Sequence, residues 1–187
     1  MGSPEALSAA LALYSNPRLT EALRRARLPK GMTLLLQVAA GEEEALASGS
    51  AATGRSPASL QKAAGFFIEQ ILLAAGTDSY RTFGLEREAT DLVLRQHMAL
   101  ILRWLHPDVT GNRSSERRLD RSVFASRVTN AWELVKNSER RSSYHASLGG
   151  GTTGSLAVPA PQKPLRVYAI PGDGLFGWFT RYFGGRK

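Results

Sequence analysis

Three histidines and no cysteine limit the chemistry that this sequence can offer. His106 lies two residues before Asp108, with Pro107 between them, so the pair could be drawn as a general base and its orienting carboxylate. A single intervening proline prevents the two side chains from orienting each other readily, and no nucleophile is arranged around them in sequence. His97, His106 and His145 also lack metal-ligand spacing. The sequence therefore predicts a protein without enzymatic activity, cofactor or metal site.

The tripeptide lies between two segments with helical hydrophobic periodicity, the first of which is residues 90–105. This segment lacks Gly and Pro, starts with the N-cap residue Thr90, and has one apolar stripe: Leu94, Met98, Ile101, Leu102 and Leu105. Because Pro107 disfavours helical backbone angles at His106, we expect the helix to end near Leu105. Beyond residue 119 a second helix carries a matching stripe: Phe124, Val128, Ala131 and Val135, with Trp132 at its edge. The two are expected to form an antiparallel hairpin with the tripeptide at its tip.

Two further motifs flank this predicted hairpin. The first is an acidic residue and a tyrosine followed by an apolar-Gly-apolar step: Asp78, Tyr80, Phe83, Gly84 and Leu85. The second is a polar, charged stretch that leads to a late tyrosine: Asn137, Ser138, Glu139, Arg140, Arg141 and Tyr144. With these motifs and the ungapped spacing from Gly84 through Thr90 to His106, residues 77–147 resemble the J-domain family of co-chaperones.

The resemblance implies a co-chaperone that docks on a DnaK-type ATPase chaperone and stimulates its hydrolysis of ATP, while performing no chemistry itself. In that family, His-Pro-Asp and a basic face of the preceding helix make the contact. Asp108 would offer a carboxylate to a basic residue of the partner, and Pro107 would limit the entropy lost on docking. His106 would hold the loop or donate a hydrogen bond. The partner-binding residues implied here are His106, Pro107, Asp108, Arg95, Gln96 and Arg103.

The helix before the tripeptide departs from the family pattern. Apolar residues stand where members often carry Lys or Arg: Ala99, Leu100 and Trp104. They contribute to a second apolar stripe, distinct from the first: Val93, His97, Leu100 and Trp104. One interpretation is that this stripe packs against the helices of residues 1–76 to make an extended domain. The alternative is a degenerate J-like interaction or scaffold module whose chaperone surface is partly covered.

The sequence predicts an all-α protein in which a J-domain hairpin is joined to an additional amino-terminal helical region and a flexible carboxy-terminal tail. Residues 1–76 form the amino-terminal region, whose strongest predicted helix starts at Ser56-Pro57 and ends at Gly76. Residues 77–148 are the predicted J-domain. Residues 149–164 have the composition of a flexible Gly/Pro-rich linker, and residues 165–187 form an aromatic, basic tail.

The formal net charge is +8, and residues 149–187 carry five basic residues and one acidic residue. Large apolar residues in this tail suit either docking on the protein or a weak contact with an anionic membrane: Leu175, Phe176, Trp178, Phe179, Tyr182 and Phe183. The chain lacks a basic leader and an apolar run of about 20 residues, which favours a cytoplasmic protein, with peripheral membrane association as the alternative.

A cluster of arginines follows the tripeptide: Arg113, Arg117, Arg118, Arg121, Arg127, Arg140 and Arg141. Phosphate contacts need little beyond Lys and Arg, so nucleic acid is a further candidate ligand. Because the sequence contains no recognisable nucleic-acid readout motif, we expect a solvated face and consider nucleic acid an unlikely partner. The sequence does not indicate a client protein.

Overall fold

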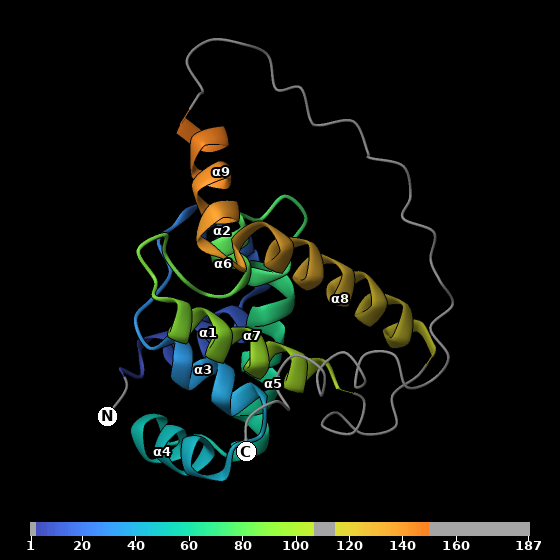
Figure 1. The fold of residues 1–187 in the computed structure, drawn as a ribbon. Coiled ribbons are helices and arrows are strands. Elements are labelled where there is room, and N and C mark those ends of the chain that lie inside the picture. The colour runs from blue at the N-terminus through green and yellow to red at the C-terminus, as the bar shows by residue number, and fades with distance from the viewer. Residues whose placement is uncertain (1–2, 107–114, 150–187) are drawn as a thin grey trace, which may run out of the picture. The chain divides into compact units, whose positions relative to one another are not determined.

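The computed structural model describes residues 3–106 and 115–149, with the side chains of 115–120 and 148–149 left out. These residues contain no β-strand, which confirms the all-α class. The helices are α1 (Glu5–Ser15), the 3-10 turn η1 (Pro17–Leu19), α2 (Thr20–Arg25), α3 (Met32–Ala39), α4 (Glu43–Thr53), α5 (Pro57–Phe67), the π-helical turn η2 (Ile68–Leu72), α6 (Ser79–Thr82), α7 (Asp91–Leu105), α8 (Ser115–Val135) and α9 (Ser138–Gly149) (Figure 1). The predictions for Pro107, Asp108, the linker and the tail concern residues outside the described part.

The amino-terminal region consists of several short helices, as predicted. Helix α5 is in contact with α1, α3 and α4, so it forms the centre of this region. Ser56 is the N-cap of α5, with its hydroxyl accepting from the Ser59 backbone N–H, and Pro57 occupies the first turn. The side chains buried here are large and apolar: Leu7, Leu13, Leu35, Leu36, Leu60 and Phe67.

The helix predicted from Ser56 to Gly76 is shorter and changes its winding. It is α-helical only to Phe67 and continues as a π-helical turn, in which the Leu73 N–H bonds to the Ile68 carbonyl at 2.9 Å. The extra residue in that turn rotates the apolar face by one position. Consecutive apolar residues are therefore all buried at the end of this helix: Ile71, Leu72, Leu73 and Ala74.

Helix α7 is packed on two sides, as its two apolar stripes predict. Thr90 caps it, with the side-chain oxygen 3.4 Å from the Val93 N–H. The first stripe is buried at Leu94, Met98, Ile101 and Leu105, whereas Leu102 is half-buried. The second stripe is buried at His97, Leu100 and Trp104, and α7 is in contact with α3. The second stripe thus packs against the amino-terminal helices, as one interpretation of the sequence expects, with Val93 half-buried.

Helix α8 runs antiparallel to α7. The Arg121 guanidinium, near the start of α8, reaches the end of α7, and Arg141, after α8, forms an ion pair of 2.5 Å with Asp91 at the start of α7. Buried α8 residues face this contact: Val128, Ala131, Trp132 and Val135. Phe83 meets Trp132 edge-on, with ring centroids 6.2 Å apart. None of the helices in the described residues is long and apolar enough to cross a membrane.

Candidate functional site

Helix α7 ends one residue before the predicted turn. Leu105 is its last residue, and His106 has an extended backbone (φ −64°, ψ 135°) with its N–H bonded to the Arg103 carbonyl at 3.1 Å. Because a residue before proline avoids helical angles, this geometry is the one that Pro107 requires. The His106 side chain is half-buried. Pro107 and Asp108 lie outside the described residues, so the structure describes this site only as far as the end of α7 and His106.

Arg121 of α8 binds the end of α7. Its Nη1 lies 3.1 Å from the carbonyl oxygen of Leu105 and 3.4 Å from that of His106. The last carbonyls of a helix have no partner within the helix, and a cation there also interacts favourably with the helix dipole. The His106 carbonyl belongs to the peptide bond that joins His106 to Pro107. Arg121 therefore contacts the first peptide of the tripeptide itself.

The outward face of α7 carries the other candidate residues that sequence analysis named. Arg95, Gln96 and Arg103 are all exposed, and positions 95, 96 and 103 fall on one side of a helix. Leu92, one turn before Arg95, is 77% exposed. Arg103 forms an ion pair of 3.7 Å with Glu42, which immediately precedes α4. The structure thus gathers these three polar residues on one open face that leads to His106.

His97 lies on the opposite, buried side of α7 and has a structural role. Its Nδ1 is 2.7 Å from the Phe83 carbonyl oxygen and its Nε2 is 2.8 Å from Thr33 Oγ1. Burial lowers the pKa of His97, and the hydrogen bond to Phe83 only partly opposes that shift. A neutral imidazole with both nitrogens engaged cannot bind a metal. Within residues 3–106 and 115–149, no group of acidic and histidine side chains could hold one.

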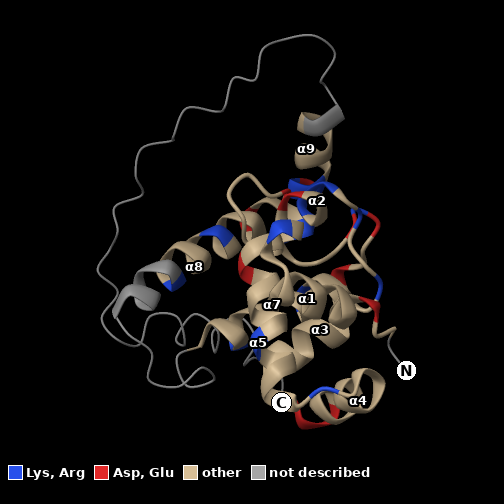
Figure 2. Ribbon diagram, turned by 180° about the vertical axis from the view of Figure 1, so that it is seen from behind, with Lys and Arg blue, Asp and Glu red and all other residues tan. Residues whose placement is uncertain are grey.

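Several arginines bind helix ends. Arg121 binds the Leu105 carbonyl at the end of α7. Arg127 binds the carbonyl of Leu73, the residue that follows η2. Arg141 binds the Val135 carbonyl, at the end of α8, at 3.2 Å. The prediction of a solvated face is wrong for these three residues, since each is half-buried and serves as a helix cap. Figure 2 shows Lys and Arg positions on α2 and α8 with acidic positions near them. Among the cluster residues whose side chains the structure describes, Arg121, Arg127 and Arg141 therefore serve the fold, whereas Arg140 is exposed.

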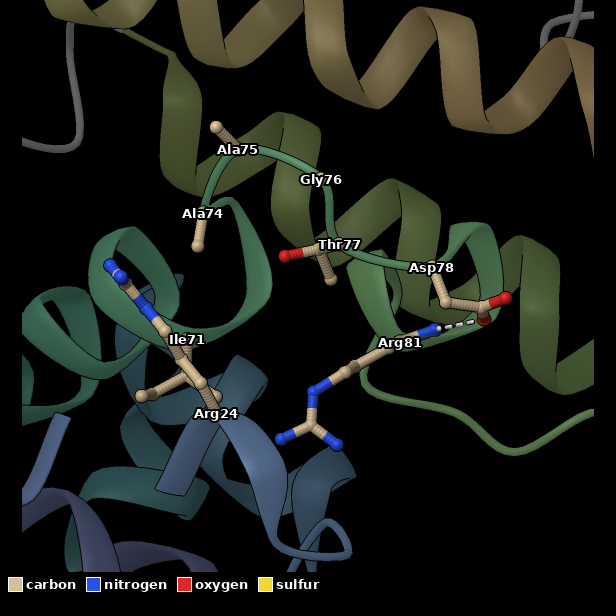
Figure 3. Close-up of a pocket in the computed structure, with 8 residues that line it drawn as sticks. All are labelled: Arg24, Ile71, Ala74, Ala75, Gly76, Thr77, Asp78 and Arg81. Atoms are coloured by element: carbon tan, nitrogen blue, oxygen red, sulfur yellow. Dashed lines mark hydrogen bonds between the residues drawn. The ribbon is translucent and has the colours of Figure 1, made fainter. Parts of the chain in front are cut away.

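A pocket of about 240 Å³ lies between α2, η2 and the segment before α6 (Figure 3). Its polar lining includes Arg24, Asp78 and Arg81. The Arg24 Nε donates to the Gln70 carbonyl at 2.8 Å, and Arg81 donates to the carbonyls of Leu23 and Ala26. The Asp78 carboxylate caps α6. Each of these charged groups therefore holds a hydrogen bond within the fold, and the Thr77 hydroxyl completes the polar lining.

Tyr144 joins the two ends of the region that resembles a J-domain. Its hydroxyl donates to Asp78 Oδ2 at 2.6 Å and accepts from the Ser79 N–H at 3.2 Å. Burial, then the hydrogen bond to Asp78, raises the pKa of Tyr144, so the phenol remains a donor. Nearby, the Tyr80 hydroxyl and His145 Nε2 are 3.0 Å apart. In the sequence, only the resemblance relates the motif around Asp78 to the one around Tyr144, because no local pattern links residues so distant along the chain.

The arrangement at the end of α7 suits recognition of a partner surface. It provides an open helical face with Arg95 and Arg103, and a helix terminus whose Leu105 and His106 carbonyls accept from Arg121. Such groups supply charge-assisted hydrogen bonds to acidic side chains. Comparisons with models of known protein families, with curated proteins and with solved structures found no significant match to this chain.

Proposed function

We propose that this chain is a non-enzymatic J-domain co-chaperone, which docks on a DnaK-type ATPase chaperone and stimulates its hydrolysis of ATP. The observation that carries the proposal is the end of α7. The helix stops immediately before His106-Pro107-Asp108, and the exposed Arg95, Gln96 and Arg103 share the face that leads to this end.

Packing around α7 supports the proposal. Antiparallel contact with α8 gives the helix pair that the resemblance implies, and Arg121 of α8 binds the carbonyl of His106. The hydrogen bond from Tyr144 to Asp78 joins the two flanking motifs of the resemblance. Motifs that are far apart in sequence are thus in contact in the fold. Such agreement between local sequence and tertiary contacts favours a J-domain arrangement over a tripeptide that occurs by chance.

The amino-terminal region packs on a different side of α7 from Arg95 and Gln96, and it reaches the proposed chaperone-binding face at Arg103 through Glu42. It buries His97, Leu100 and Trp104, whereas Arg95 and Gln96 stay exposed. This separation favours a competent co-chaperone over the alternative, a degenerate J-like scaffold module with a covered surface. The covering of the second stripe also explains why apolar residues replace the usual basic residues there: they belong to an internal interface.

The test is the ATPase rate of a cognate DnaK-type chaperone with and without the full-length protein. We expect stimulation by the wild type and its loss in His106→Gln and in Asp108→Asn. Glu88→Gln is the control, since it removes one negative charge at an exposed position away from the tripeptide, and it should stimulate normally. Circular dichroism and melting temperature establish that each variant is folded. Normal stimulation by a folded Asp108→Asn would overturn the proposal, and absence of stimulation by the wild type would favour the scaffold alternative.

A further inference from the structure

The pocket between α2, η2 and the segment before α6 has an apolar wall and a basic side. Ile71 and Ala74 are buried and form part of the wall, while Arg24 and Arg81 supply positive charge. We propose that this pocket is a binding site for a small organic carboxylate with an apolar body, held through Arg24 and the Thr77 hydroxyl. Its lining residues are distinct from the proposed chaperone-binding residues, so the two proposals are independent.

Arg24 presents the hydrogen-bond donors that a carboxylate needs. Its Nε donates to the Gln70 carbonyl at 2.8 Å, which anchors the guanidinium beside the pocket. Within the described part of the chain this is the one hydrogen bond of the Arg24 side chain, so Nη1 and Nη2 keep their donors. The free edge of a guanidinium offers two parallel N–H groups that match the two oxygens of a carboxylate. Because the group is already anchored, less side-chain entropy is lost on binding.

Arg81 adds a positive charge that no ion pair with a described residue balances. Its guanidinium is half-buried and donates to two backbone carbonyls, those of Ala26 at 2.9 Å and Leu23 at 2.7 Å. Burial lowers the pKa of Arg81, and the nearby Asp78 carboxylate opposes that shift only in part. Removing a charge from water is costly unless an opposite charge lies close to it. An anion in the pocket would supply that charge.

Asp78 is the acidic residue of the lining, and its carboxylate is held by the protein. Oδ1 accepts from the backbone N–H groups of Tyr80 at 2.9 Å and Arg81 at 3.3 Å, and Oδ2 accepts from the Tyr144 hydroxyl at 2.6 Å. Two arginines and one carboxylate leave the lining with a single excess positive charge. This balance suits a carboxylate, which carries one negative charge, better than a phosphate group with about −1.5 to −2.

The Thr77 side chain and the size of the pocket define the rest of the ligand. Figure 3 shows the Thr77 hydroxyl directed toward the side of the pocket where Ala74 and the Arg24 guanidinium lie. No described residue is hydrogen-bonded to this hydroxyl, so it can donate to a carboxylate oxygen. An apolar cavity of about 150 Å³ holds benzene. A pocket of about 240 Å³ therefore has room for one ring beside the carboxylate, with the ring against Ile71 and Ala74.

Benzoate is the probe for this site, and benzamide is its uncharged counterpart of the same shape. Each is titrated into isotope-labelled full-length protein, and the backbone amide resonances are followed by NMR. We expect benzoate to shift the amides of residues 74–78 and to saturate them with a dissociation constant on the order of 1 mM. Benzamide should bind at least about tenfold more weakly, because it cannot form charge-assisted hydrogen bonds. Equal binding of the two probes, or no saturable shift with benzoate, would overturn the proposal.

Inorganic phosphate, titrated in the same way, tests the choice of anion. It should bind more weakly than benzoate, because it carries more charge than the lining balances and has no apolar body. Tighter binding of phosphate would overturn the assignment to a carboxylate.

Variants of α2 separate the pocket from the general charge of the region. Arg24→Gln should weaken benzoate binding by about tenfold. Arg25→Gln removes the same charge at the next position, where the side chain is exposed, pairs with Glu21 and lies outside the lining, so it should bind as the wild type does. Equal losses in the two variants would show that benzoate responds only to net charge and would sink the site.

Thr77→Val keeps the proposal testable if Arg24→Gln does not fold, as judged by circular dichroism and melting temperature. It retains the shape of the side chain and removes a hydroxyl that has no hydrogen bond to a described residue. We expect about a threefold loss of benzoate affinity, the effect of one hydrogen bond from an uncharged donor. Unchanged affinity in Thr77→Val would contradict the proposed mode of binding.

Discussion

Thr33 and His97 join the amino-terminal helices to α7, with Thr33 Oγ1 2.8 Å from His97 Nε2. His97 Nδ1 faces the Phe83 carbonyl, which can only accept, so Nδ1 carries the proton and Nε2 accepts from the Thr33 hydroxyl. Three segments of the chain therefore meet at one imidazole: α3, the segment after α6 and α7. Because both nitrogens are used in this buried site, the neutral form of His97 is required for the observed bonds.

This requirement predicts a pH dependence of stability. Burial lowers the pKa of His97 from its ordinary value of 6.5, so the unfolded chain takes up a proton before the folded protein does. The free energy of unfolding should therefore fall as the pH drops below 6.5 and continue to fall until the pH reaches the folded-state pKa. Above the ordinary pKa, His97 should contribute no slope.

Urea unfolding between about pH 7.5 and about pH 5.5 measures this slope. In His97→Gln the slope should be smaller, since the substituted side chain does not titrate. His106 and His145 are retained in both proteins, so any contribution from them cancels in the comparison. Equal slopes for the wild type and His97→Gln would contradict the account of this site.

The packing of α7 could be predicted from the sequence because helical periodicity reports which faces are apolar. The stripe of Val93, His97, Leu100 and Trp104 required a second packing partner, and the amino-terminal region provides it. The amino-terminal region was one predicted partner, but the residue in it that meets His97 could not be predicted. Thr33 lies in a short apolar segment, and its contact with His97 depends on the relative placement of helices that are distant along the chain.

The roles of the arginines could not be predicted for a related physical reason. Arg121 and Arg127 belong to a basic cluster that looks the same in sequence whether it is solvated, binds phosphate or caps helices. Their acceptors are backbone carbonyls of Leu105, His106 and Leu73, which carry no sequence signature as acceptors. Only the folded arrangement of α8 against the ends of α7 and η2 distinguishes these roles.

The contact between α5 and Trp104 gives a prediction about stability. A Cβ atom on Gly65 would lie 3.3 Å from Trp104 Nε1, so there is no room for a large side chain. Gly65→Leu should lower the free energy of unfolding by about 1–3 kcal/mol or more through overpacking. Ala58→Leu, on the exposed part of the same helix, should change it by less than about 0.5 kcal/mol. Urea unfolding of both variants measures the difference, and equal values would mean that Trp104 does not pack on Gly65.

The hydrogen bonds of Tyr144 give a second prediction about stability. Tyr144→Phe keeps the ring but removes the hydroxyl shared by Asp78 and Ser79. Because the acceptor is a carboxylate, the expected loss is about 1.5–3 kcal/mol in the free energy of unfolding. Ser143→Ala is the control, since its hydroxyl is exposed and bonds only within α9. A loss in Tyr144→Phe no greater than in Ser143→Ala would show that this junction does not secure α9.

The ion pair between Glu42 and Arg103 predicts how the amino-terminal region modulates chaperone binding under the proposed function. The two side chains are 3.7 Å apart and 31% and 55% exposed, so the carboxylate partly neutralises Arg103 while solvent screens the pair. Arg95 has no such carboxylate among the ion pairs of the described residues. Arg95→Gln should therefore raise the half-maximal concentration for ATPase stimulation more than Arg103→Gln does.

Removing the carboxylate should have the opposite effect. Glu42→Gln frees Arg103 for an acidic partner surface and should lower the half-maximal concentration by about twofold at low ionic strength, with a smaller effect at higher salt. Glu43→Gln changes the net charge equally at the next position, where the side chain is exposed, and thus separates the specific ion pair from the general field. If both glutamine variants shift the titration by the same factor, the modulation comes from net charge, and the contact between Glu42 and Arg103 has no part in it.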